Sequence, residues 1–325
     1  MFSRLCTTSA AVSRNVSRRC MSKVIGIVTE KPFSATAIDA ISNVFAETGF
    51  DVKRFEGDFD HHEAVKGLDA IIVRSDKITA DVMDSAGGSL KLVVRAGAGV
   101  DSIDLDAATA RDIVVQNTPG QNANAVAELV FGMMISSARN NYDGTSGFEL
   151  KGKTLALYGY GAIAQHVHRL ATGFGMEVWA FDPFVDPATL TAAGVKSIQE
   201  PADLFNANFV SLHCPLTKDT RASIGMHVVD RMPKKGVLIN TARKEIIDEA
   251  GLVEVLTKRK DLSYFGDVQL DSEHAAKLTE NTNVQFTAKK MGAQTAEANT
   301  NAGTAAAAQI IEFFECGTNR FQVNK

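Results

Sequence analysis

Short apolar segments alternate along the chain with longer stretches in which apolar residues recur every three or four positions. The apolar segments predict strands of parallel sheets that are covered on both faces, because such strands carry no polar alternation. The predicted strands lie at 24–28, 51–55, 70–73, 92–94, 113–115, 155–158, 177–181, 209–212, 237–240, 264–268 and 284–286. The stretches between them predict helices, of which the clearest are 37–47, 123–138 and 302–315. Strands that alternate with helices in this way predict a doubly wound α/β fold.

A glycine-rich turn between a strand and a helix predicts a dinucleotide-binding site. The turn consists of Gly159, Tyr160, Gly161, Ala162, Ile163 and Ala164. Gly159 permits the tight bend and Gly161 permits close approach to a pyrophosphate. The helix that starts at Ala162 and Ile163 offers unpaired N–H groups to the anion. Asp182 ends the next strand, 182 − 161 = 21 residues after Gly161, where a carboxylate can bind ribose hydroxyls and repel a 2′-phosphate. The pattern predicts NAD rather than NADP; the alternative is a connection whose glycines serve geometry alone.

The position of this turn divides the chain of 325 residues into two domains. A first α/β unit of about one hundred residues precedes helix 123–138, and the dinucleotide turn follows that helix. The helix 302–315 can return to the first unit. We therefore expect two doubly wound parallel-sheet domains. They are a flavodoxin-like substrate-binding domain, residues 22–119 with 298–325, and a Rossmann NAD-binding domain, residues 120–297, inserted into it.

The first 21 residues differ in composition from the rest of the chain. They contain Arg4, Arg14, Arg18 and Arg19, several serines and threonines, and no acidic residue. This composition, without an apolar core segment, is typical of a mitochondrial transit peptide rather than of a secretory signal. We expect import into the mitochondrial matrix and cleavage near residue 20. A tail without a targeting role is the alternative, and a second start at Met21 would yield a cytoplasmic form.

The overall composition argues against several classes of partner. A net charge of −4 gives no general attraction to nucleic acid or to an anionic membrane. The cysteines, Cys6, Cys20, Cys214 and Cys316, form no metal-ligand cluster, so neither zinc nor structural disulfides are expected. The most apolar helix, 123–138, is too short to cross a bilayer. It is apolar on nearly every side, which predicts burial in a domain or subunit interface, and we expect a homodimer or a higher homo-oligomer.

Three further motifs follow strands of the two predicted domains. The first is Val94–Asp101, the second is Leu212–Thr217 and the third is Asn240–Arg243. Each lies at the carboxyl end of a strand, which is where open α/β sheets bind their ligands. The motifs are therefore candidates for the ligand-binding edge of each sheet.

Together with the glycine-rich turn, these motifs resemble the D-2-hydroxyacid dehydrogenase family, and most closely its phosphoglycerate dehydrogenases. The matching segments are VRAGAGVDSIDLDAATARDIVVQNTPG, LHCPLTKDT and VLINTARKEIIDE, and the resemblance extends over residues 22 to 325. It implies NAD-dependent oxidation of D-3-phosphoglycerate to 3-phosphohydroxypyruvate, the first step of the phosphorylated route to L-serine. It also implies a short form without the regulatory carboxyl-terminal domains of longer relatives.

The resemblance implies roles for individual residues of this chain. The family's catalytic arginine falls on Arg243, whose planar guanidinium can clamp a carboxylate with two hydrogen bonds. Arg74 and Arg95 fall on arginines that recognise substrate and phosphate. The substrate carboxylate would be held by the backbone of Gly97, Ala98, Gly99 and Val100. The other cofactor positions are Cys214, Pro215, Thr220, Thr241, Ala242 and, at the nicotinamide amide, Asp267. The alternatives are an ion pair of Arg243 with Glu245 or Asp248, and solvated surface charge for Arg74 and Arg95.

The acid–base pair is where the sequence departs from the family. The family's glutamate falls on Ser272 and its histidine on Lys290. We predict that Lys290 replaces the histidine, with a pKa lowered from about 10.4 by burial and by the cations Arg243 and Lys289. A glutamate partner would raise that pKa, so its loss suits a lysine base.

Two other functions compete with this prediction. If Lys290 is a solvated charge, the chain is an NAD(H)-binding sensor or scaffold without turnover. Glu273 and His274 are close enough in sequence to replace the acid–base pair, but they lie out of the family's register. Within the same chemistry, the chain could be a glyoxylate or hydroxypyruvate reductase, whose kinetic constants would not depend on a substrate phosphate.

Overall fold

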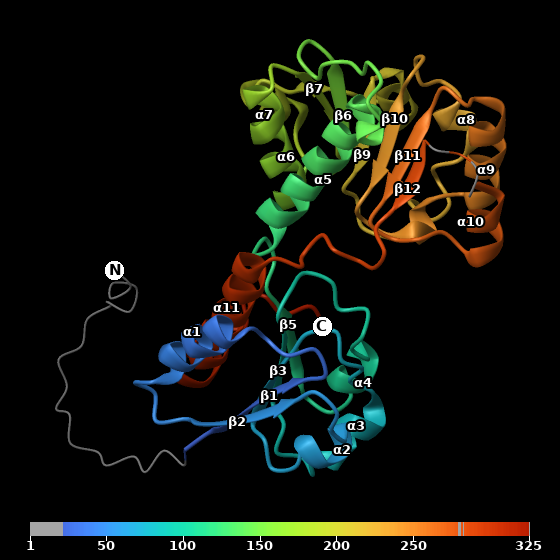
Figure 1. Cartoon of the computed structure of the whole chain (residues 1–325). Helices are drawn as coiled ribbons and strands as arrows, with labels where there is room; N and C mark the ends of the chain where they lie inside the picture. Colours follow the sequence, from blue (N-terminus) through green and yellow to red (C-terminus); the bar gives the residue numbers. More distant parts are fainter. Residues whose placement is uncertain (1–21, 279–280, 282, 325) are drawn as a thin grey trace.

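The computed structural model describes residues 22–278, 281 and 283–324. The expected presequence, residues 1–21, lies outside the described residues. Figure 1 shows two α/β bodies, one built on strands β1 to β5 and the other on strands β6 to β12. The chain passes between them before helix α5 (Ala123–Ala138) and again before helix α11 (Ala296–Cys316).

The first body contains a five-stranded parallel sheet in the order β2-β1-β3-β4-β5. Its strands are β1 (Val24–Thr29), β2 (Asp51–Glu56), β3 (Ala70–Val73), β4 (Leu92–Arg95) and β5 (Val114–Asn117). One face packs against α1 (Ala35–Phe45) and α11. The other face packs against α2 (His61–Ala64), α3 (Ala80–Ser85) and α4 (Leu105–Thr109). Successive residues of the inner strands alternate between these two cores, which is why β1, β3 and β4 are largely apolar. The edge strand β2 carries four charged residues, and none of its residues is buried.

The second body contains a seven-stranded parallel sheet in the order β12-β11-β10-β9-β6-β7-β8. Its strands are β6 (Thr154–Tyr158), β7 (Glu177–Phe181), β8 (Lys196–Ser197), β9 (Phe209–Leu212), β10 (Val237–Asn240), β11 (Ser263–Gly266) and β12 (Val284–Phe286). One face packs against α5, α6 (Ala162–Gly173) and α7 (Pro187–Ala192). The other packs against η2 (Pro201–Asn206), α8 (Met226–Val229), α9 (Glu249–Lys258) and α10 (Ser272–Leu278). Two further single turns are η1 (Asn140–Tyr142) and η3 (Lys244–Ile246).

The strand orders confirm the predicted fold class. The first sheet has the flavodoxin-like order, and the second has the Rossmann order, in which the strand sequence reverses between β6 and β9. In the first sheet the strand order reverses between β1 and β3, and in the second between β6 and β9. Loops at the carboxyl ends of these strands flank each reversal point. Both sheets therefore present a ligand-binding edge.

Some boundaries differ from the sequence prediction. Helix α11 begins at Ala296 rather than at Ala302, because the Thr295 side chain caps it by accepting a hydrogen bond from the Ala298 N–H. Its first turns are rich in polar residues, which hid the helical pattern. The helix ends at Cys316, one residue beyond the predicted end, and Gly317 follows as its C-cap with a left-handed φ of 69°.

Helix α5 has the predicted bounds and lies largely in the core of the second body. Its buried residues contact α6 and the strands of the second sheet. Burial within this domain explains why the helix is apolar on nearly every side. In the described part of the chain, no helix is both long and apolar enough to span a membrane.

Candidate functional site

A cleft of about 390 Å³ lies between the two bodies. The first body contributes the loops that follow β1, β3 and β4, and the second contributes the loops that follow β10, β11 and β12. The lining includes Lys31, Arg74, Arg95, Gly97, Ala98, Gly99, Asp101, Ile163, Thr241, Arg243, Asp267, Lys289 and Lys290. Residues predicted from separate motifs therefore meet at one site.

Three arginines at the carboxyl ends of three different strands converge on this cleft. Arg74 follows β3, Arg95 ends β4 and Arg243 follows β10. Burial lowers the pKa of Arg95, and the charges of Arg243 and Arg74 lower its pKa further. Such a cluster of mutually repelling cations is stabilised by an anion, and a ligand with two anionic groups would neutralise more of it than a ligand with one.

The loop after β4 fits closely around two of these arginines. A Cβ atom on Gly97, where φ is +144°, would lie 1.5 Å from Arg95 Nη1. A Cβ atom on Gly99 would lie 2.6 Å from Arg243 Nη2. The carbonyl oxygens of Gly97 and Ala98 accept hydrogen bonds from Thr118 N and Asn117 Nδ2. The loop from Gly97 to Val100 is thus held through its carbonyl groups beside both guanidinium groups, an arrangement that suits a carboxylate ligand.

Arg243 forms an ion pair across the cleft. Its Nη2 donates to Asp101 Oδ2 at 2.9 Å, and the Asp101 side chain is 78% exposed. The alternative partner Asp248 instead caps α9 by accepting from Gly251 N. Sequence reasoning missed Asp101 as a partner because it belongs to the other domain. An exposed carboxylate is a partner that an anionic ligand can displace.

Lys290 lies in the same cleft with a lowered pKa. Partial burial by the cleft walls is the largest cause, and Arg243 and Arg95 add to it, although Asp267 and Asp101 oppose the shift. Lys290 is nevertheless an exposed residue, so the cleft walls cover only part of it. As predicted, the charge of Arg243 contributes to the lowered pKa of Lys290. The second contributing cation is Arg95 rather than the predicted Lys289.

Asp267 holds the loop that carries Lys290. The Asp267 carboxylate is buried and accepts hydrogen bonds from Thr287 Oγ1, Met291 N and Gly292 N. A Cβ atom on Gly292 would lie 2.9 Å from Asp267 Oδ2, so glycine allows this close approach. In the structure Asp267 positions the loop; its contact with a nicotinamide amide stays a prediction.

The alternative acid–base residues are directed elsewhere. His274 Nδ1 lies 3.1 Å from Glu249 Oε2 on α9, and Glu273 pairs with Lys277 along α10. Neither residue lines the cleft. The side chain of Ser272 lies outside the described part of the structure.

The glycine-rich turn has the geometry that a pyrophosphate requires. Gly159 has a φ of +95°, and a Cβ atom there would lie 2.9 Å from the backbone of His213. Gly161 is the N-cap of α6, where a Cβ would meet open space. Asp182 accepts hydrogen bonds from Tyr160 N at 2.8 Å and from Phe184 N at 2.9 Å. The carboxylate is therefore fixed beside the turn, and Ala162 and Ile163 begin the helix behind it.

The loops after β9 and β10 complete this edge of the second sheet. Thr220 Oγ1 donates to Pro215 O at 2.7 Å and holds the loop after β9. Burial raises the pKa of the Cys214 thiol to about 11, so this thiol is not a nucleophile near neutral pH. Asn240 accepts from Ala242 N and donates to Arg243 O, which fixes the turn that presents Arg243. Thr241 Oγ1 is buried without a hydrogen-bond partner among the described residues, as expected for a group that awaits a ligand.

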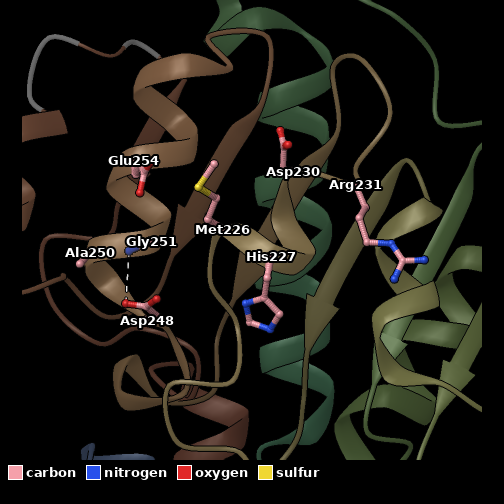
Figure 2. Close-up of a pocket in the computed structure, with 8 residues that line it drawn as sticks. All are labelled: Met226, His227, Asp230, Arg231, Asp248, Ala250, Gly251 and Glu254. Carbon is pink, nitrogen blue, oxygen red and sulfur yellow. Dashed lines mark hydrogen bonds between the residues drawn. The ribbon is translucent and has the colours of Figure 1, made fainter.

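A second groove, of about 670 Å³, lies between α8 and α9 on the second body (Figure 2). Its ionic side chains already have partners within the protein. Asp230 pairs with Arg259, Arg231 with Asp203, Glu254 with Lys258, and Asp248 caps α9. Figure 2 shows His227, Asp230 and Arg231 pointing in different directions. The interdomain cleft, with its converging arginines, is therefore the stronger candidate site.

Comparison with known proteins places the chain in a family. The model for the D-isomer specific 2-hydroxyacid dehydrogenase, NAD binding domain, matches residues 125–289. The chain belongs to the D-2-hydroxyacid dehydrogenase family. Its second body is the family's NAD-binding domain, and the fixed Asp182, the open face of Gly161 and the unpartnered Thr241 hydroxyl fit that cofactor.

Individual relatives show which members of the family this chain is similar to. The chain is 38% identical over 76% of its length to a D-3-phosphoglycerate dehydrogenase of Methanocaldococcus jannaschii, and covers 50% of that protein. It is 37% identical over 73% of its length to a hydroxypyruvate reductase of Thermotoga maritima, and covers 81% of that protein. An NAD+-bound 3-phosphoglycerate dehydrogenase of Entamoeba histolytica has 41% identity and a TM-score of 0.85, covering 94% of this chain and 99% of that one. The chain thus spans about half the length of the first relative and nearly all of the similar structure.

Replacing Asp182 with asparagine should weaken NAD binding and reduce the preference for NAD over NADP. The substitution keeps a side-chain oxygen at the turn but removes the charge that binds the ribose hydroxyls and repels a 2′-phosphate. We expect the Kd for NAD to rise about tenfold or more. Calorimetric titration of both cofactors measures this. The control is Asp203→Asn, which removes a carboxylate that pairs with Arg231. An unchanged ratio of the two affinities would show that Asp182 does not select the cofactor.

Proposed function

We propose that the protein is an NAD-dependent D-3-phosphoglycerate dehydrogenase, which forms 3-phosphohydroxypyruvate. The convergence of Arg74, Arg95 and Arg243 on the cleft carries this proposal. The substrate has a carboxylate and a phosphate at its two ends, and both groups favour guanidinium partners. Support also comes from the relatives of this name and from the position of the cleft beside the NAD-binding domain.

The cleft residues have two separate tasks in this mechanism, substrate binding and proton transfer. Arg243 binds the substrate carboxylate and polarises the oxygen on C2, and it exchanges its contact with Asp101 for the substrate. The loop from Gly97 to Val100 holds the same carboxylate through backbone N–H groups. Arg74 and Arg95 face the phosphate end.

Lys290 carries the proton in this mechanism. In its neutral form Lys290 Nζ removes the proton of the C2 hydroxyl, because a lowered pKa provides more free amine near neutral pH. When bound, NAD supplies the acceptor for the hydride that leaves C2, so the alcohol becomes a ketone. The walls of the two domains exclude water from the reacting groups when the cleft closes.

A specific observation supports a second candidate, reduction of unphosphorylated hydroxypyruvate. The guanidinium of Arg74 already donates to Lys31 O, Pro32 O and Asn299 Oδ1, at distances between 2.6 and 2.9 Å. An arginine held in this way has fewer donors left for a phosphate. The relative named as a hydroxypyruvate reductase agrees with this candidate.

The variant Arg74→Ala distinguishes the two candidates. For a phosphoglycerate dehydrogenase we expect the KM for 3-phosphohydroxypyruvate to rise about tenfold or more, because a charge-assisted contact is lost. The KM for hydroxypyruvate should stay the same. Steady-state NADH oxidation with both substrates measures the difference. Equal effects on the two substrates would favour the reductase.

The cellular setting remains a proposal from the sequence. The expected import signal in residues 1–21 supports the mitochondrial matrix, and the product suits the phosphorylated route to L-serine. Fractionation of cells that express the full chain tests the location. A homodimer likewise stays a prediction, which sedimentation of the purified chain tests.

A further inference from the structure

A buried carboxylate joins the two loops that border the phosphate end of the cleft. Asp76 is 3% exposed and lies just beyond β3. Its Oδ1 accepts a hydrogen bond from Glu30 N at 2.7 Å, and its Oδ2 accepts one from Arg74 N at 3.0 Å. Glu30 directly follows β1, which pairs with β3. One side chain thus fixes the ends of both strands at the reversal point of the first sheet.

The same two loops also hold each other through the guanidinium of Arg74. Its Nη1 donates to Lys31 O and Pro32 O, which belong to the loop after β1. The guanidinium lies over the ring of Phe33, with its carbon 5.1 Å from the ring centroid. The place of this guanidinium therefore depends on the loop that Asp76 anchors.

Helix α11 holds the other side of the guanidinium. Asn299 Oδ1 accepts from Arg74 Nη2 at 2.6 Å, and Asn299 Nδ2 donates to Thr295 O on the same helix. The orientation of the Asn299 amide is thereby fixed. Arg74 is consequently held between the loop after β1 and the start of α11.

The negative charge of Asp76 also stabilises the charged form of Arg74. Burial lowers the pKa of Arg74, and the nearby Asp76 carboxylate opposes this shift. On its other side, His61 Nε2 lies 3.6 Å from Asp76 Oδ1. Two backbone donors, the Arg74 guanidinium and the His61 ring thus surround the buried carboxylate, which does not line the cleft.

We propose that Asp76 and Asn299 are the positioning residues that hold Arg74 in the phosphate subsite and so determine preference for a phosphorylated substrate. This inference rests on the proposed function. Asp76 acts through Arg74 and the loop after β1 and contacts no substrate. A binding group that is fixed in advance binds more tightly than a mobile one, because less ordering accompanies binding.

The test compares Asp76→Asn with a matched control on the same pair of strands. Glu30 N and Arg74 N donate to different oxygens of Asp76. Asparagine replaces one of these oxygens with an NH₂ group, so one of the two N–H groups then faces a donor. Asp69 forms the equivalent bridge at the opposite end of β1 and β3, where it accepts from Lys23 Nζ and Val24 N. Asp69→Asn therefore removes a similar bridge far from the cleft.

We expect Asp76→Asn to raise the KM for 3-phosphohydroxypyruvate about tenfold and to leave the KM for hydroxypyruvate and both kcat values close to the wild type. Asp69→Asn should leave the ratio of the two KM values unchanged. In an Arg74→Ala background, Asp76→Asn should add no further loss, because both changes remove the same interaction. Asn299→Ala should reproduce the selective loss if Asp76→Asn does not fold.

Each contrary outcome identifies what has failed. If the wild type turns over but shows no preference for the phosphorylated substrate, both the proposed function and this inference are wrong. If the wild type has the preference, and Asp76→Asn either keeps it or raises the KM values of both substrates by the same factor, only the positioning role is wrong. An additive loss in the Arg74→Ala background would equally overturn action through Arg74.

Discussion

The variant Arg243→Ala is expected to abolish turnover while NAD still binds. Arg243 lies at the centre of the cleft, fixed by Asn240 and paired with an exposed carboxylate that a substrate can displace. In the proposed mechanism its positive charge stabilises the oxygen on C2 of the substrate and orients the substrate carboxylate in the transition state. Loss of such a group costs about 4 kcal/mol, which corresponds to a decrease of about a thousandfold in kcat.

Stopped-flow or steady-state NADH oxidation measures the loss, and calorimetric titration of NAD without substrate measures cofactor binding. Arg243→Lys is the conservative variant; it should restore little activity, since an ammonium cannot make the bidentate contact. Arg231→Ala removes a surface ion pair outside the cleft and serves as the control for general effects. Loss of NAD binding in Arg243→Ala would assign a structural role to this arginine instead.

The second large effect is expected from Lys290. Its pKa is lowered, so the free amine needed for oxidation forms at a lower pH than for an ordinary lysine. Oxidation should therefore speed up as the pH rises and level off once Lys290 is neutral. Reduction should slow over the same interval, because it requires the protonated amine as the acid. The variant Lys290→Ala should lose about a hundredfold or more in kcat, together with this pH dependence.

Two further variants separate the proton carrier from a general cation. Lys289→Ala removes the neighbouring charge and should keep the pH dependence of the wild type, since Lys289 does not contribute to the lowered pKa of Lys290. Lys290→His should restore part of the activity and move the rise in oxidation to lower pH, because histidine has a lower ordinary pKa. If Lys290→Ala retains full activity, another group carries the proton and the lysine base is excluded.

The fold could be predicted from the sequence because the inner strands of both sheets are buried on both faces. Segments such as 70–73 and 237–240 are apolar throughout, and they became β3 and β10 with the predicted bounds. Strand β8 was missed because it has only two residues and packs at the sheet edge, where an apolar run is not required. The start of α11 was missed because its polar residues face the cleft and the solvent.

The site could be predicted only in part, for reasons of distance along the chain. Arg243 and Lys290 stand in recognisable segments, so the sequence identified them as candidates. Their neighbours are set by tertiary structure: Asp101 is 142 residues from Arg243, and Asn299 is 225 residues from Arg74. Asp76 carried no motif at all. Its importance is visible only when β1 and β3 are seen side by side.

Reduction of 3-phosphohydroxypyruvate by the chain from Met21 tests the central claim most directly. The measurement follows NADH oxidation with this substrate and, in parallel, with hydroxypyruvate. The cleft with its arginines predicts rapid turnover and a clear preference for the phosphorylated acid. A folded chain that binds NADH but oxidises it with neither substrate would contradict the proposed enzyme and support an NAD(H) sensor.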